Sequence, residues 1–235
     1  MTVADTSALD SFLQKWRHRW PEWSVAETFV PAPRRDVVVA WFALLQEFED
    51  AMNIAGDTLP ADAKLAWWGE ELRSWVQHRS RHPLGRLLEP VRAPWNGLAE
   101  ALPDLIEARS HAVDGETAST RLQRYGHAVA AIEGVLLGRV ATPDAVVTQL
   151  LAQRLSEGQA IVPDRVSDER GSPQVRAAHG LLSRWPDNAG GARERRMFAR
   201  LARARLQRLA RTGHPAEAPS RMRLLFTVWR AARGG

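Results

Sequence analysis

Apolar residues recur at helical spacing along almost the whole chain, and this periodicity restricts the fold more than any other feature of the sequence. No segment shows the sustained alternation of β-branched or aromatic residues that is typical of strands. The sequence therefore predicts an all-α protein. The expected helices cover residues 6–18, 34–55, 62–79, 94–110, 116–138, 143–157, 173–184, 193–211 and 219–233.

Turn residues separate the expected helices without dividing the chain. Asp62, Thr142 and Ser172 are suited to cap the helices that follow them, because a short polar side chain can accept from a free backbone N–H there. The two expected loops, 161–171 and 185–191, are too short to act as linkers, and the sequence contains no repeat. A single helical domain spanning all 235 residues is therefore expected.

The composition is that of an ordinary globular protein, with 45% hydrophobic and 25% charged residues. No run approaches the roughly 20 apolar residues that a bilayer-spanning helix needs, and the N-terminus has no signal-peptide pattern. The chain contains no cysteine, which excludes disulfides, thiolate nucleophiles and cysteine-bound metals. These features favour a cytoplasmic protein. Association of that protein with a membrane surface is compatible with them.

The chain is basic, with a formal net charge of +5. Only Lys15 and Lys64 are lysines, so 30 of the 32 basic residues are arginine, and coding bias explains this skew most simply. Within the most basic segment, 192–211, a packed amphipathic helix with a solvated arginine face is the favoured interpretation. The alternative is an anionic-surface binder, with acidic lipid favoured over nucleic acid because aromatic side chains do not interleave with the arginines. The apolar stripe of this segment consists of Met197, Phe198, Leu201, Ala202, Leu206 and Leu209.

Ten tryptophans are the strongest oddity of the composition. Trp16, Trp20 and Trp23 cluster near the N-terminus among arginines and a proline. Packing against the rest of the molecule is the favoured interpretation for these three. If they are exposed, they are the best candidates for contact with a membrane or a partner.

Four segments, in the right order along the chain, resemble the squalene/phytoene synthase family. Lys64–Leu72 (KLAWWGEEL) is similar to a helix of that family with a double tryptophan, and His82-Pro83 follows at the usual distance. Tyr125–Gly138 resembles its mid-chain helix. Gln149–Pro163 looks like a shortened form of a segment that carries one of its acidic motifs, and Arg221–Arg233 is similar to the final helix of many bacterial members.

This resemblance implies a single helical bundle of the isoprenoid synthase type around a deep apolar cavity for two prenyl chains. In the family, two aspartate-rich motifs on facing helices bind magnesium, which holds the diphosphate groups. The chemistry needs carboxylate oxygens on one helical face, because Mg²⁺ prefers oxygen ligands and must hold the charge of the departing diphosphate.

The two acidic motifs are incomplete in this sequence. In the first, Glu47 and Asp50 share a helical face, but neither has a carboxylate four residues further on. In the second, the corresponding series is Gln149, Gln153 and Glu157, with two neutral amides. A solvated acidic face near arginines is the favoured interpretation of Glu47 and Asp50, and loss of catalysis follows.

Three functional hypotheses remain. The favoured one is a catalytically impaired protein that binds an isoprenoid or acts as an assembly module without a cofactor. The resemblance allows such a role, since the family includes relatives without intact acidic motifs, among them an assembly factor for respiratory complex I. The third hypothesis is the basic-helix binder of anionic lipid or, less favoured, nucleic acid. No oligomeric state follows from the sequence.

The second hypothesis is an active, magnesium-dependent enzyme that condenses two prenyl diphosphates head to head. An open apolar channel between helices 34–55 and 143–157 would favour it, whereas a channel filled by side chains would argue against prenyl substrates. Its metal candidates are Glu47, Asp50, Glu70 and Glu71. Its substrate-binding candidates are Tyr125, Arg73, Arg154, Trp67 and Trp68.

Overall fold

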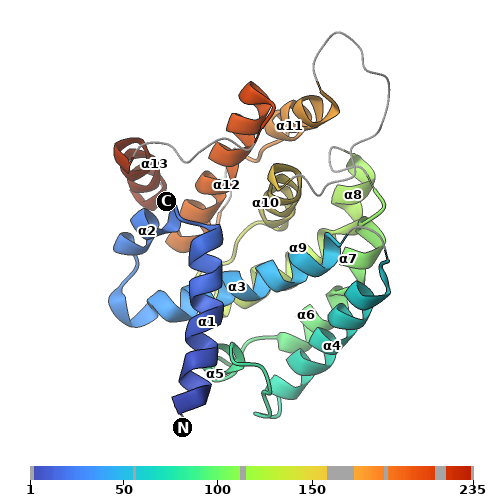
Figure 1. Cartoon of the computed structure of the whole chain (residues 1–235), viewed down its shortest axis with the longest axis vertical. Coiled ribbons are helices and arrows are strands. Elements are labelled where there is room, and N and C mark those ends of the chain that lie inside the picture. Colours follow the sequence, from blue (N-terminus) through green and yellow to red (C-terminus); the bar gives the residue numbers. More distant parts are fainter. Residues whose placement is uncertain are drawn as a thin grey trace.

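The expected all-α architecture is confirmed by a computed structural model, which describes residues 3–54, 57–111, 115–157, 172–187, 190–214 and 221–233 (Figure 1). These residues form helices and no strand; one isolated bridge joins Ala141 to Gly190. No helix among them is long and apolar enough to cross a bilayer. The elements are α1 (Val3–Arg19), α2 (Trp23–Ala26), the 3-10 helices η1 (Glu27–Phe29) and η2 (Ala32–Arg34), α3 (Arg35–Met52), α4 (Leu59–Trp75), α5 (Gly85–Leu88), α6 (Trp95–Ala101), α7 (Pro103–Ala108), α8 (Glu116–Arg121), α9 (Gln123–Leu136), α10 (Pro143–Ser156), α11 (Pro173–Ser183), α12 (Arg193–Thr212) and α13 (Arg221–Arg233).

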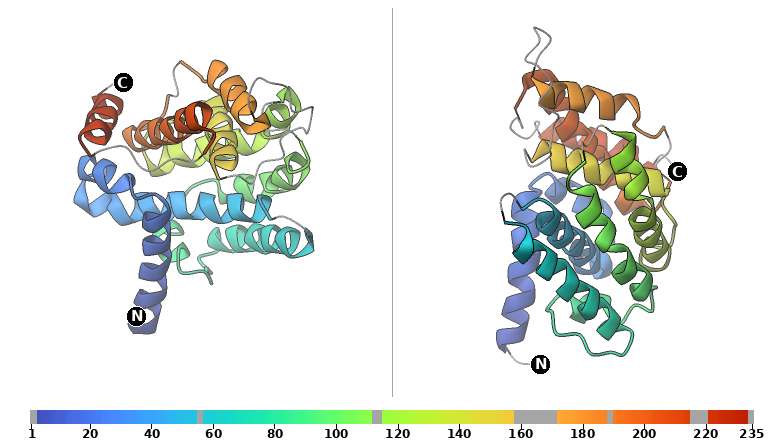
Figure 2. Two further views of the ribbon diagram at one scale, coloured as in Figure 1. Left: turned by 45° about the horizontal axis from the view of Figure 1, so that its top comes forward. Right: turned by 90° about the vertical axis from the view of Figure 1, so that its right-hand side faces the viewer.

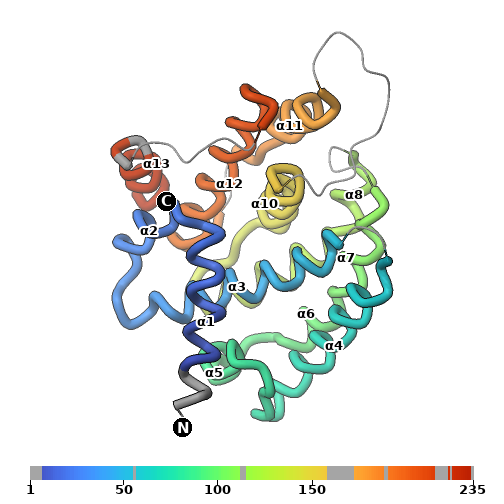
Figure 3. The backbone as a smooth tube through the Cα atoms, viewed as in Figure 1, coloured from blue at the N-terminus to red at the C-terminus, as the bar shows by residue number. Residues whose placement is uncertain are grey.

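Helix α3 lies in the middle of the molecule. Figure 2 shows α4 on one side of it and α10 and α12 on the other, and Figure 3 follows the same path in the backbone. Nearly every residue of α3 from Val38 to Met52 is buried, polar ones included. A helix that is covered all round must find partners for its polar side chains, because an unpaired buried polar group costs free energy. The site described below follows from this demand.

The tryptophans near the N-terminus belong to the core. Trp16, Trp20 and Trp23 are 2%, 1% and 0% exposed and pack around Phe42 of α3 and Phe198 of α12. Ring centroids lie 5.8 Å apart for Trp16 and Phe42, and 4.6 Å apart for Trp20 and Phe198. The alternative, in which these indoles contact a membrane or a partner, is therefore wrong, because almost none of their surface is exposed.

Of the three expected helix caps, Ser172 alone makes a capping hydrogen bond. Asp62 is not a cap, because α4 already begins at Leu59, and Asp62 instead pairs with Arg109 at 2.7 Å. Thr142 makes no capping bond, whereas Ser172 Oγ accepts from the N–H of Val175 as expected. The expected loop 161–171 lies outside the described residues.

Candidate functional site

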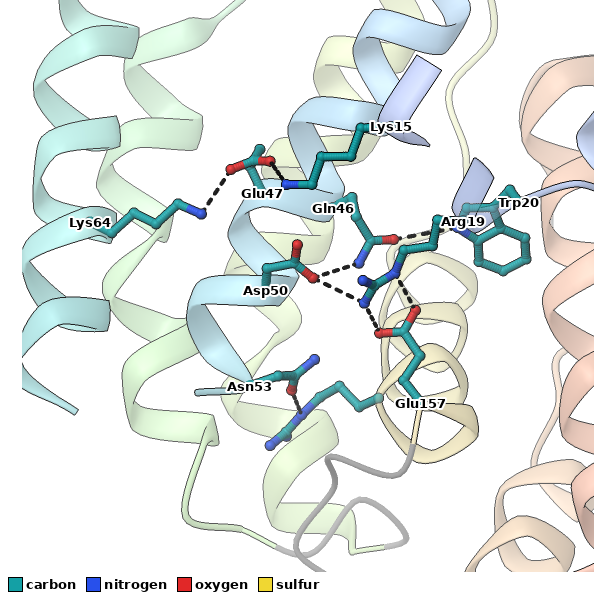
Figure 4. Close-up of polar contacts among 10 residues, drawn as sticks. Lys15, Arg19, Trp20, Gln46, Glu47, Asp50, Asn53, Lys64 and Glu157 are labelled. Atoms are coloured by element: carbon teal, nitrogen blue, oxygen red, sulfur yellow. Dashed lines mark hydrogen bonds and ion pairs between the residues drawn. The ribbon is translucent and has the colours of Figure 1, made fainter. Parts of the chain in front are cut away.

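The last two turns of α3 carry the polar residues of the first acidic segment, and Glu47 is the member nearest α4. Its Oε1 accepts from Lys15 Nζ of α1 at 3.1 Å, and its Oε2 accepts from Lys64 Nζ of α4 at 2.8 Å (Figure 4). Burial alone would raise the pKa of Glu47, but the hydrogen bonds and charges of Lys64 and Lys15 outweigh it and lower the pKa. The carboxylate is therefore ionised and held between two ammonium groups.

Arg19 of α1 joins the two acidic segments directly. Its guanidinium donates to Asp50 Oδ1 at 3.0 Å and, through Nε, to Glu157 Oε1 at 3.0 Å, with a second bond to Glu157 Oε2 (Figure 4). Gln46 Nε2 donates to the same oxygen of Asp50 at 3.1 Å. Burial opposes the charge of Arg19, but the bonds and charges of Glu157 and Asp50 raise its pKa. One cation of the chain therefore stands between Asp50 of the first acidic segment and Glu157 of the second.

Glu49 points into the interior from the same turn of α3. It is 4% exposed, and its Oε2 has no hydrogen-bond partner. Burial, together with the charges of Glu157 and Asp50, raises the pKa of Glu49 well above its usual value. A neutral, protonated Glu49 is the form that this environment favours, and a neutral acid is a poor metal ligand.

Arg154 crosses from α10 to α3. It is 1% exposed, and its Nε donates to Asn53 Oδ1 at 2.8 Å, while a second nitrogen donates to the backbone oxygen of Arg109 at 3.3 Å. Burial and the nearby charge of Arg109 lower the pKa of Arg154 to about 10. This cation therefore links α10 to the residues that directly follow α3 and α7, while its Nη1 has no hydrogen-bond partner among the described residues.

A buried hydrogen-bond network connects Gln149 of α10 with side chains of α12, α9 and α3. Arg195 of α12 forms a bidentate ion pair with Glu133 of α9, and both side chains are almost fully buried. Arg195 also donates to Gln149 Oε1 at 2.9 Å, and Trp41 Nε1 of α3 donates to Glu133 at 2.8 Å. The amide of Gln149 is thus committed to an arginine.

The double-tryptophan segment of α4 serves packing in this structure. Buried Glu71 accepts at Oε1 from Trp75 Nε1 and from the backbone N–H groups of Arg81 and His82, at 3.0, 2.7 and 2.8 Å. Trp68 is 1% exposed and packs on the His82 ring. The carboxylate of Glu71 therefore fixes the chain after α4 and is removed from the metal candidates.

The other predicted site residues do not gather at one place. Glu70 and Arg73 are exposed on α4, and Trp67 lies at its surface with the guanidinium of Arg81 over its ring at 5.5 Å. Tyr125 of α9 is 2% exposed, and burial raises its pKa well above the usual value. Of the substrate candidates, Arg154 and Tyr125 therefore lie near the end of α3, and Trp68 packs on Phe48 of the same helix.

The expected solvated acidic face is wrong, since Glu47 is buried and Asp50 is half-buried with cations on both. Across the described ranges, no three His, Cys, Asp or Glu side chains are arranged to hold a metal ion. A pocket of about 570 Å³ lies between α8, α10 and α11. Its wall includes Thr148 and Leu151, on the face of α10 opposite Gln149 and Gln153.

The residues that sequence reasoning missed are the cations Lys15, Arg19 and Arg195. Their contacts span 32, 31 and 62 residues of sequence, so no local pattern reveals them. One signal was present: the two lysines of an arginine-rich chain both bind the same carboxylate, Glu47. A compact ammonium suits a site shared by two cations, where a planar guanidinium would be bulkier.

A family model described as squalene/phytoene synthase matches residues 21–162, which is more than half of the chain and contains α3, α4, α9 and α10. No curated protein and no solved structure matches the chain.

Proposed function

The chain belongs to the squalene/phytoene synthase family, and we propose that it is a catalytically impaired member that uses the helical scaffold as a binding or assembly module. The single observation that carries this proposal is the position of Arg19, which binds Asp50 and Glu157 together. A magnesium ion at this place would have to compete with the guanidinium for these two carboxylates.

The donor set does not fit a magnesium–diphosphate site. Mg²⁺ requires about six oxygen ligands in near-octahedral geometry, several of them usually water. Here Glu47 is neutralised by Lys15 and Lys64, and Arg19 serves Asp50. An incoming cation would have to displace chain-borne cations whose attachment to the fold makes their local concentration very high. No catalytic step is therefore assigned to magnesium.

The contacts across α3 and α10 favour assembly over transport or storage of a prenyl chain. Arg19 spans Asp50 and Glu157 (Figure 4), and Arg154 bonds directly to Asn53. These polar groups come from the two helices between which a channel would have to open, or bond to them. Charged and amide groups are unsuited to line a site for an apolar chain, because such a chain would break their hydrogen bonds and offer none in return. An isoprenoid ligand at another place stays a prediction.

The direct test is an assay for pyrophosphate. The purified protein is incubated with farnesyl or geranylgeranyl diphosphate and Mg²⁺, and released pyrophosphate and apolar products are measured. We expect no release above that of heat-unfolded protein. Release that persists in the folded protein and is abolished by Asp50→Asn would overturn the proposal and support the active prenyltransferase.

A second test examines the metal-binding capacity without any substrate. The melting temperature is measured in MgCl₂ and in NaCl of equal ionic strength for the wild type, for Arg19→Ala and for Arg17→Ala. Arg17 is the matched control, because it lies on the same helix but pairs with Glu27 and Asp36. We expect Arg19→Ala to lose about 1–2 kcal/mol of stability, since it leaves partly buried carboxylates unpaired.

Only Arg19→Ala should regain stability specifically with Mg²⁺, which would screen the freed carboxylates of Asp50 and Glu157. A saturable rise in the melting temperature of the wild type with Mg²⁺, but not with NaCl, would show that the arginine does not replace the metal.

A further inference from the structure

The outer face of α13 carries an exposed apolar row. Met222, Leu225, Phe226 and Trp229 are 77%, 43%, 59% and 39% exposed, and their spacing places them on one side of the helix. The rings of Phe226 and Trp229 stack with centroids 6.0 Å apart. The opposite side of α13 is the buried one, with Leu224, Val228 and Ala231 packed in the core. The helix is therefore apolar on both sides, and within the described part of the chain only the Leu224 side packs against other residues.

Arginines border this row. Arg230 lies over the Phe226 ring at 5.8 Å and Arg233 over the Trp229 ring at 4.6 Å. From the neighbouring helix α12, Arg200 and Arg203 join Arg230 and Phe226 in lining a pocket of about 220 Å³. Two helices thus bring aromatic rings and guanidinium groups to one surface.

These arginines differ from the others of α12. Arg195 pairs with Glu133, and Arg205 with Glu22. No carboxylate of the described residues pairs with Arg200, Arg203 or Arg230, and Nε of Arg203 is buried without a partner. Burial and the charges of Arg203 and Arg230 lower the pKa of Arg200. Among the described residues, carboxylates therefore pair with one side of the basic helix and not with the arginines beside α13.

We propose that the exposed row of α13 and the unpaired arginines of α12 and α13 form a docking surface for an anionic phospholipid membrane. The row of Met222, Leu225, Phe226 and Trp229 enters the boundary between headgroups and acyl chains, as an amphipathic helix does. The guanidinium groups of Arg200, Arg203 and Arg230 contact lipid phosphates, for which their planar forks are suited. Trp229 sits at the level where an indole is most stable, between apolar chains and water.

Charge and shape favour a membrane over other occupants. A second copy of the chain would bring arginines against arginines around the same row. A nucleic acid would use the arginines but leave Met222 and Leu225 exposed, and Phe226 and Trp229 stack on each other instead of on a base. A negatively charged surface with an apolar layer beneath it satisfies both features.

The test is sedimentation with vesicles of phosphatidylcholine alone and with about one-third phosphatidylglycerol, a content that gives a strongly anionic surface. We expect the wild type to bind only the anionic vesicles. The double variant Phe226→Ser/Trp229→Ser and the double variant Arg200→Gln/Arg230→Gln should each lower the partition about tenfold. All four side chains are exposed, so the melting temperatures should stay near that of the wild type.

Matched controls remove equal groups elsewhere. Leu59→Ser replaces an exposed apolar residue on α4, and Arg73→Gln/Arg92→Gln removes two exposed arginines; both should bind as the wild type does. Equal losses in the control and test arginine variants would mean that net charge alone drives binding, and would overturn the proposal. Vesicle binding that Phe226→Ser/Trp229→Ser leaves unchanged would also overturn it. The same holds if the wild type does not bind vesicles but self-associates or binds DNA, and this variant abolishes that activity.

Discussion

His82 shows at the scale of single residues how the motif after α4 works in this chain. The imidazole packs on the rings of Phe12 and Trp68 at 4.5 Å from each, and its Nδ1 accepts from the N–H of Leu84 at 3.2 Å. Burial, with a smaller contribution from Lys64, lowers the pKa of His82 to about 4, although Glu47 and Glu71 act in the opposite direction. The neutral ring is therefore the form that the folded chain accepts.

This environment predicts a pH dependence of stability. From pH 6.5 down to about 4, the unfolded chain binds a proton at His82 that the folded chain does not bind. The free energy of unfolding should therefore fall as the pH is lowered through this window. Above the window, the stabilisation that comes from the neutral His82 ring should be fully present. His82→Asn keeps an acceptor for Leu84 but cannot titrate, so its stability should depend less steeply on pH. Urea unfolding at several pH values measures both slopes; equal slopes would contradict the assignment.

Residue types in the candidate site were predictable, but their partners were not. Periodicity placed Glu47 and Asp50 on one face of a helix, and this is confirmed in α3. Which cation meets each carboxylate depends on how α1 crosses α3, and no spacing within either helix encodes that crossing. For the same reason Glu71 was taken as a metal candidate, because its neighbours at Arg81 and His82 come from a loop beyond the helix end.

At the scale of elements, α9 and α10 pack tightly against each other at Gly126. A Cβ built on Gly126 of α9 would lie 2.9 Å from the backbone oxygen of Pro143 and 2.9 Å from Val147 Cγ2. A carbonyl oxygen at the start of α10 cannot move away as a flexible side chain could. The absence of a side chain at Gly126 is what allows α10, with Gln149 and Arg154, to approach α9 so closely.

The Gly126→Ala variant should accordingly be destabilised, by about 1–3 kcal/mol, because the methyl group separates two packed helices. Gly97 of α6 is the matched control, since a Cβ there meets nothing within 4 Å and the position is exposed. Gly97→Ala should gain about 0.5–1 kcal/mol from higher helix propensity. Chemical denaturation measures both changes; a Gly126→Ala protein as stable as the wild type would show that α9 and α10 can shift apart without cost.

Long helices were predictable, whereas their interruptions were not. Segments 34–55 and 193–211 correspond to α3 and α12 within a few residues. The expected helix 116–138 is two helices, because Leu122 has φ −88° and ψ 0° and ends the α conformation. The apolar pattern continues across this residue, so periodicity alone cannot detect the break. Short elements such as α5 (Gly85–Leu88) carry too few residues for any period to emerge.

At the scale of the whole molecule, one apolar core runs from α1 to α13 through the described residues. Buried polar contacts cross it as well, since Trp41 and Arg195 both bind Glu133. The expected single domain stays a prediction, and it implies one cooperative unfolding transition. In urea, far-ultraviolet circular dichroism, which reports helices, and near-ultraviolet circular dichroism, which reports aromatic packing, should give the same midpoint. Two separate midpoints would contradict the single domain and show that the chain contains more than one cooperative unit.

The all-α class and the family scaffold were within reach of sequence reasoning at this scale, because they rest on many weak signals along the whole chain. Burial of a single group is a different matter. Trp16, Trp20 and Trp23 stand in a polar, arginine-rich stretch and still lie inside, because α1 packs on α3 and α2 packs on α12. Only the three-dimensional course of the chain distinguishes this outcome from an exposed aromatic cluster.

The distribution of the indoles gives the protein an optical signature. Seven of the ten tryptophans are buried, while Trp67 and Trp229 are 37% and 39% exposed. Each of these two rings has a guanidinium over it, from Arg81 and Arg233 respectively. Negatively charged iodide should therefore quench the red-shifted part of the fluorescence more effectively than positively charged caesium. Neither ion should quench the buried indoles, whose emission lies at shorter wavelength. The emission of Trp67 and Trp229 can therefore be measured separately from that of the buried indoles.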